Sequence, residues 1–191
     1  MHKAKKLMLA STILVLTFII PLAVLGEDAK PIQILKRYAD KKTGFFFEYP
    51  ELAGWVMQET ADVNAPGSVS FVNKEINASL SVGHMKLPAV TPDLSIPGML
   101  DAAVADIFGS YKKNRPDAKL LSSRIVTNPN NKVKGVEMVY TDKIHDNLLK
   151  IKDSIFFKGT NRYSVTAIAR DKDFDRVDKD FFAVVLKSLR F

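Results

Sequence analysis

The chain contains no cysteine among its 191 residues. This absence excludes disulfide bonds, thiol catalysis, iron–sulfur clusters and zinc sites built from thiolates. It also excludes the acylated cysteine that follows the cleavage site of a bacterial lipoprotein. A domain of this composition must therefore be stabilised by its hydrophobic core alone.

Histidine is scarce as well: the chain has three, and only His84 and His145 follow the first 26 residues. A metal site would need them to converge with carboxylates such as Asp142 or Asp146, and nothing in their spacing requires that. His145 lies in a polar segment typical of a turn, where a solvated side chain is the simpler interpretation. We expect no metal site here.

Motifs for other chemistry are missing or incomplete. The chain has no G-x-S-x-G elbow and no glycine-rich phosphate loop. Residues 171–175 resemble the first half of a calcium loop, but Arg176 replaces the required glycine and Phe182 replaces the bidentate glutamate. Helix capping by Asp171 or Asp173 explains these acids better. We therefore expect no cofactor and no enzymatic activity.

The charge is positive but dispersed. The chain has 28 basic and 21 acidic residues, and without Lys3, Lys5 and Lys6 the net charge falls from +7 to +4. Nucleic-acid binding needs a concentrated basic stripe, so we expect no nucleic-acid partner. A charge of this size favours loose contact with anionic lipid, cell wall or acidic proteins.

The first 26 residues have the composition of an export signal. A short basic head precedes an uncharged run from Leu7 to Gly26, and Glu27 then begins a polar chain. The sequence predicts a signal peptide cleaved after Gly26 and a location in the periplasm, outside the cell or in a lumen. Because the run is about 20 residues long, an uncleaved anchor formed by residues 7–26 is the alternative.

The remaining chain alternates between strand and helix patterns. Residues 27–42 are a polar lead-in that could form a short strand or a helical turn. Apolar residues recur at helical spacing from Met99 to Tyr111, and Pro116 ends this helix. A second helix is predicted from about Asp173 to Leu189. The predicted strands span residues 43–50, 55–57, 69–72, 77–87, 120–127, 133–141, 148–157 and 162–169.

This order predicts an α+β fold. The links between the strands after Leu120 are too short for crossover connections, so the sheet should be mainly antiparallel. Each amphipathic helix must bury its apolar face, and the natural arrangement is a sheet covered by helices.

Two segments resemble a known family. Residues 43–50, Thr-Gly-Phe-Phe-Phe-Glu-Tyr-Pro, with Trp55 shortly after, are similar to the opening of PsbP-like domains. The carboxyl-terminal part of the chain is similar to the same family. The matching residues are Phe156 and Phe157, residues 162–167, and the final Leu-Lys-Ser-Leu-Arg-Phe. The resemblance spans residues 42–191, and we take 43–191 as the domain.

The resemblance implies an α-β-α sandwich. The best-known members are extrinsic lumenal subunits of photosystem II, which help retain calcium and chloride and act by docking. Many relatives, including DcrB-like exported bacterial proteins, have no settled activity. This chain has a plain export signal in place of a long bipartite plastid transit peptide, so a photosystem role follows by analogy only.

The densest basic cluster is Lys112, Lys113 and Arg115, at the end of the first predicted helix. These residues are candidates for docking an anionic partner. They are also what the negative end of a helix dipole attracts on a solvated surface. Trp55 could belong to the core or to an interface.

The sequence thus predicts an exported, non-enzymatic domain that docks to and stabilises a membrane-associated or envelope protein. One alternative is an envelope hydrolase, which would require His84 or His145 to face a serine or a carboxylate in a cleft. The other is a small-ligand or ion-binding protein.

The export signal makes a direct prediction. Mass spectrometry of the native protein should find Glu27 at its amino terminus, because the peptidase removes the apolar run. A protein that keeps residues 1–26 and sediments with membranes would establish the anchor instead. An intact leader on a lipid-free protein in the cytosol would contradict export altogether.

Overall fold

The computed structural model describes residues 34–60, 68–88, 92–144 and 146–191. The predicted leader and His145 lie outside these ranges. The chain order is β1 (Leu35–Ala39), β2 (Phe46–Pro50), β3 (Val56–Thr60), β4 (Ser68–Asn73), β5 (Ala78–Lys86), α1 (Met99–Asn114), β6 (Lys119–Thr127), β7 (Lys134–Ile144), β8 (Asn147–Lys158), β9 (Asn161–Arg170), α2 (Asp171–Val177), the π-helical turn η1 (Asp178–Phe182) and α3 (Ala183–Ser188).

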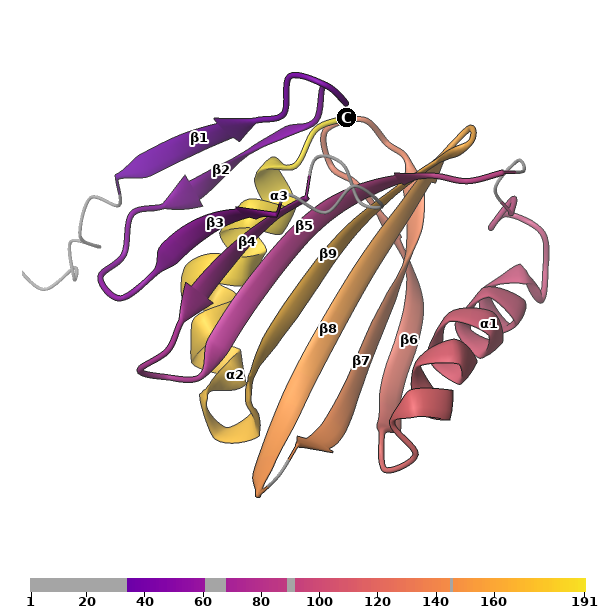
Figure 1. The fold of residues 1–191 in the computed structure, drawn as a ribbon. Coiled ribbons are helices and arrows are strands. Elements are labelled where there is room, and N and C mark those ends of the chain that lie inside the picture. Colours follow the sequence, from indigo (N-terminus) through magenta and orange to yellow (C-terminus); the bar gives the residue numbers. More distant parts are fainter. Residues whose placement is uncertain (1–33, 61–67, 89–91, 145) are drawn as a thin grey trace, which may run out of the picture. The chain divides into compact units, whose positions relative to one another are not determined.

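The predicted antiparallel sheet is confirmed. Seven strands pair in the order β3-β4-β5-β9-β8-β7-β6, and every pairing is antiparallel. The helix α1 packs on β6 and β7, whereas α2 packs on β8 and β9. Figure 1 shows α1 on one side of the sheet and α2 with α3 on the other. The α-β-α sandwich is therefore confirmed as well.

Successive side chains along each strand point to opposite faces of the sheet, and this alternation separates two apolar clusters. On β9, Tyr163, Val165 and Ala167 are buried toward the carboxyl-terminal helix. On β7, Val136, Met138 and Tyr140 belong to the cluster beneath α1. This two-residue period is what the sequence pattern detects. Among the described residues, no helix is both long enough and apolar enough to cross a bilayer.

The strands β1 and β2 form a separate two-stranded ribbon. Tyr38 pairs with Phe47, and their rings stack with centroids 5.3 Å apart. β1 lies inside residues 27–42, so the polar lead-in contributes an ordered strand. β2 is fastened to the carboxyl terminus by reciprocal backbone hydrogen bonds between Phe46 and Arg190, of 2.9 and 2.8 Å.

The last helix differs from the regular helix that the sequence predicts. The wider turn η1 shifts the register, so both Phe181 and Phe182 are buried and Val184 is only half-buried. The predicted cap by Asp171 or Asp173 is wrong. No side chain caps this helix, and Asp173 accepts a hydrogen bond from Arg170 Nε at 2.9 Å.

The turn after β6 was predicted from its asparagines, but its role was not. Asn128 and Asn130 donate through Nδ2 to the carbonyl of Leu189 at 3.0 Å each, and Asn130 also donates to the carbonyl of Lys187 at 2.8 Å. These carbonyls at the end of a helix lack intrahelical partners. The turn therefore closes the carboxyl terminus of α3.

Two glycines give a matched test of this packing. A methyl group on Gly135 of β7 would lie 2.4 Å from the carbonyl oxygen of Ile155, whereas one on Gly109 of α1 meets nothing within 4 Å. We expect Gly135→Ala to lower the free energy of unfolding by about 1–3 kcal/mol. Gly109→Ala should raise it by about 0.5–1 kcal/mol, because alanine favours helix.

Urea denaturation of the two variants measures both changes. Equal effects of the two substitutions would contradict the close approach of β7 and β8 at Gly135.

Candidate functional site

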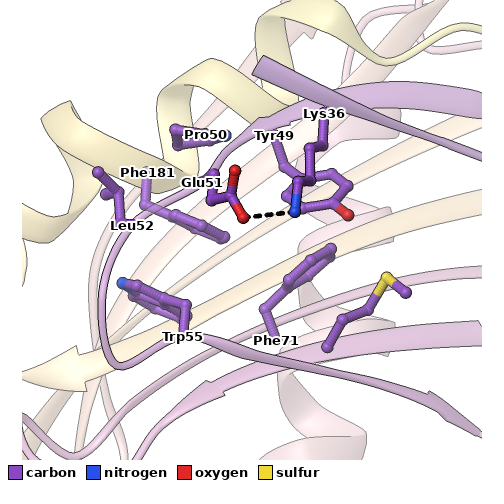
Figure 2. Close-up of a pocket in the computed structure, with 9 residues that line it drawn as sticks. Lys36, Tyr49, Pro50, Glu51, Leu52, Trp55, Phe71 and Phe181 are labelled. Atoms are coloured by element: carbon purple, nitrogen blue, oxygen red, sulfur yellow. Dashed lines mark hydrogen bonds and ion pairs between the residues drawn. The ribbon is translucent and has the colours of Figure 1, made fainter. Parts of the chain in front are cut away.

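An aromatic pocket of about 190 Å³ lies between the β1–β2 ribbon and the start of β3. Figure 2 shows its walls, with Tyr49 from the ribbon, Trp55 and Phe71 from the sheet side, and Phe181 from the last helix. The remaining lining residues are Lys36, Pro50, Glu51, Leu52 and Met57. We call this the aromatic pocket.

Trp55, the only tryptophan of the chain, is the centre of this pocket. Its indole stacks on Phe181, with centroids 4.0 Å apart and planes 3° apart. The side chain is partly buried and also lines a second cavity. The sequence left open whether Trp55 belongs to the core or to an interface. In the structure, one face of Trp55 packs on the core, and the residue also lines surface cavities.

Local backbone geometry places Trp55 there. Gly54 has φ +80°, a conformation that disfavours side chains, and a Cβ at this position would lie 2.8 Å from Nδ2 of Asn73. Trp55 N then donates to the carbonyl of Leu52 at 3.4 Å. This tight turn positions the indole of Trp55 against the ring of Phe181, immediately before β3 begins.

An ion pair stands at the mouth of the pocket. Lys36 Nζ of β1 donates a hydrogen bond to Glu51 Oε1, and both side chains are about half exposed. This hydrogen bond, with the charge of Glu51, raises the pKa of Lys36. An exposed pair of this kind contributes little to stability. It is well placed to exchange partners with an incoming ligand.

The strand beside the pocket is the edge of the sheet. Among the described strands, β3 pairs only with β4. Val56 and Met57 are 58% and 41% exposed. An edge strand presents unpaired backbone donors and acceptors that can pair with another chain.

The space beside β3 continues beyond the pocket. A cavity of about 380 Å³ lies farther along, lined by Tyr38, Lys41 and Lys42 from the ribbon side and by Glu59 from β3. Met57 faces the first cavity and Glu59 the second, two residues along the same strand. We call the two cavities together the β3 groove.

The predicted basic cluster lies elsewhere. Lys112 and Lys113 are exposed at the end of α1, over β6 and β7 at the opposite side of the sheet from β3. Arg115 Nε lies 3.9 Å from Oδ2 of Asp142, a buried carboxylate. Arg115 compensates the negative charge of buried Asp142, so its role is structural.

Asp142 belongs to a polar layer beneath α1 that the sequence did not reveal. It accepts a hydrogen bond from the hydroxyl of Tyr111 at 2.9 Å, and Asp153 accepts one from Tyr140 at 2.8 Å. Burial, followed by the bond to Asp142, raises the pKa of Tyr111 to about 12. Burial also raises the pKa of Asp153. This layer connects α1 to the sheet.

His84 contacts an asparagine and a tyrosine of β9. Its Nε2 lies 2.9 Å from Oδ1 of Asn161, and its ring packs on Tyr163 with centroids 5.0 Å apart. Within the described ranges, no three histidine or acidic side chains converge on a possible metal position. Residues 171–175, which resemble part of a calcium loop, form the first turn of α2.

Comparisons with known proteins show the fold. No family model matches the chain, and no curated protein matches it. The solution structure of cyanobacterial PsbP (CyanoP) from Synechocystis sp. PCC 6803 is 19% identical, with a TM-score of 0.62 over 83% of this chain and 93% of that one.

A second similar structure is the Ran-binding protein Mog1p of Saccharomyces cerevisiae. It is 8% identical, with a TM-score of 0.52 over 83% of this chain and 95% of that one. At these identities the likeness shows a PsbP-like fold, as the resemblance in the sequence implied.

The polar layer predicts a dependence on pH. Tyr111→Phe should lower the free energy of unfolding by about 1–2 kcal/mol at neutral pH, because buried Asp142 loses its charge-assisted hydrogen bond. The raised pKa of Tyr111 contributes stability below pH 10 that is lost as pH rises toward 12. The variant should therefore lose less stability over this window.

Thermal unfolding from pH 7 to pH 12 measures this difference. Tyr163→Phe is the control at pH 7, since burial alone raises the pKa of Tyr163, and its effect there should stay within about 0.5 kcal/mol. Equal stability of wild type and Tyr111→Phe at pH 7 would refute the role of the hydrogen bond, and parallel profiles above pH 10 would refute the raised pKa of Tyr111.

Proposed function

We propose that this chain is an exported, non-enzymatic domain that docks to a membrane-associated or envelope protein. Its docking site is the β3 groove, and the occupant is an extended segment of that protein. The segment adds to the free edge of β3 and places one apolar side chain in the aromatic pocket.

The observation that carries the proposal is the aromatic pocket beside an unpaired strand edge. Backbone pairing along a sheet edge supplies affinity, and a pocket for an individual side chain supplies specificity. Aromatic residues are enriched among those that dominate binding energy at protein interfaces. Here Tyr49, Trp55 and Phe71 surround the space that such a side chain would fill.

The size of the pocket favours a side chain over a free small molecule. Pockets that enclose drug-sized ligands occupy roughly 300–1,000 Å³. The aromatic pocket measures about 190 Å³, below this range. The second cavity of the groove measures about 380 Å³, but it is lined by the charged side chains of Lys41, Lys42 and Glu59 and lacks the apolar lining typical of such ligand sites. A larger molecule would be held mainly outside the aromatic pocket, as the rest of a partner protein is.

The similar folds support the same interpretation by analogy. The name of Mog1p describes a protein that binds Ran, and PsbP is the protein family suggested by the sequence. Fold alone does not determine function, so the groove carries more weight than this analogy. The hydrolase alternative would need His84 or His145 to face a serine or carboxylate in a cleft. The ring of His84 contacts Asn161 and Tyr163, and His145 lies outside the described residues.

Site-specific photocrosslinking tests the docking site. The chain has no cysteine, so a single introduced cysteine can carry a benzophenone at Met57 in the groove, at Lys112 in the basic cluster, or at exposed Lys179 as the control. In intact envelopes, the Met57 probe should crosslink one protein, and excess unlabelled chain should suppress the product. The Lys179 probe should give none.

The second arm uses Met57→Arg, which places a charge in the apolar part of the groove. We expect at least a tenfold loss of partner binding with an unchanged melting temperature, because Met57 is exposed. Crosslinking from Lys112 alone would move docking to the basic cluster. Crosslinking from none of the three positions would contradict docking itself.

A further inference from the structure

The outer face of the β1–β2 ribbon carries two arginines around one aromatic ring. The Cζ atoms of Arg37 and Arg190 lie 4.0 and 5.5 Å from the ring centroid of Phe46. Arg37 comes from β1, and Arg190 is the residue whose backbone pairs with Phe46. We call Arg37, Phe46 and Arg190 the arginine face.

Strand alternation separates this face from the β3 groove. Lys36 and Tyr38 of β1 line the groove, whereas Leu35 and Arg37 line neither of its two cavities and point to the other side of the ribbon. Ala39, at the end of β1, lines the second cavity. Binding at the arginine face therefore leaves the aromatic pocket open.

The two arginines form no ion pair within the described part of the chain. Among the described residues, no carboxylate lies within ion-pair distance of Arg37 or Arg190. Glu48 is the residue paired with Arg37 across the ribbon and is the nearby acid on this face. The face therefore keeps a net positive charge.

The turn that joins β1 to β2 adds positive charge beside this face, where the ribbon meets the second cavity of the β3 groove. Lys41 and Lys42 are exposed in it and line that cavity. Asp40 is buried there, and its Oδ1 accepts backbone hydrogen bonds from Lys42 at 2.6 Å and Thr43 at 3.3 Å. The exposed charges of this turn are thus both positive.

Apolar side chains lie beside these cations. Leu35, two residues before Arg37 and on the same side of β1, is 47% exposed, and Ile34, which directly precedes the strand, is 64% exposed. Exposed apolar groups, an aromatic ring and unpaired arginines are the combination that binds the interface of an anionic bilayer. A water-soluble acidic protein would supply the charge but has no need of the exposed Ile34 and Leu35.

We propose that the arginine face binds the surface of an anionic lipid bilayer. The inference extends the proposed function, since it places the domain on the membrane that carries its partner, with the β3 groove facing away from the lipid. Only eight residues, 27–34, separate β1 from the end of the uncharged run at Gly26. Fully extended, they span at most about 29 Å. A retained anchor would hold the ribbon at the bilayer.

The test uses the full chain reconstituted in phosphatidylcholine vesicles with or without phosphatidylglycerol. A single cysteine replaces Leu35, which is exposed, points to the same side as Arg37 and lines neither cavity of the groove, and it carries a fluorophore that lipid-borne nitroxide quenches. The readout is contact at this position, so the apolar run can insert without giving the signal. Lys179→Cys carries the same probe as the control.

We expect quenching at Leu35 in anionic vesicles, loss of quenching in high salt, and little quenching in phosphatidylcholine alone. Arg37→Gln and Arg190→Gln should each shift the equilibrium away from the quenched state about fivefold. Arg37→Lys should retain most of the quenching, because charge is what the bilayer attracts.

Three results would overturn the proposal: no quenching at Leu35 in anionic vesicles, equal quenching in both lipids, or equal quenching at Lys179. Because the test contains only this chain and lipid, it can fail while docking in the β3 groove still stands.

Discussion

The packing of Phe181 and Phe182 against the sheet is the interaction on which the rest of this structure depends. The π-helical turn directs both rings into the core, where a regular helix would turn one of them outward. Phe181 then supports Trp55 in a parallel stack at 4.0 Å, and Phe71 packs on Phe181 at 5.5 Å. With no disulfide available, such buried aromatic area is the main source of stability.

The same packing determines where the protein can bind. Phe181 holds Trp55 at the start of β3, and the ribbon is held opposite by Tyr49 packing on Phe71 at 4.7 Å and by the backbone pairing of Phe46 with Arg190. The space that remains between them is the β3 groove. The opposite side of the ribbon is the arginine face. One small ribbon thus separates a surface suited to a protein segment from a surface suited to lipid.

Sequence reasoning succeeded where the signal was local and periodic. The two-residue alternation of β4–β9 and the helical stripe of α1 predicted these elements and the sandwich. Sequence reasoning failed where the cause lies far away along the chain. The π-helical turn reflects the space beneath the sheet. The role of Arg115 follows from its contact with Asp142. The β3 groove joins Lys36, Trp55 and Phe181, which no local pattern connects. The available signal was the single tryptophan, and the sequence could not decide between core and interface for it.

The central claim is that a protein partner covers Trp55. Because the chain has one tryptophan, incorporation of 5-fluorotryptophan gives a single ¹⁹F resonance that reports on the aromatic pocket without background from envelope proteins. The account predicts that the chemical shift of this resonance changes when envelope membranes are titrated in. Vesicles of extracted lipid alone, which bind at the arginine face, should broaden the line but leave its chemical shift unchanged. An unaltered chemical shift while the protein sediments with the envelopes would show that docking occurs elsewhere and would contradict the account.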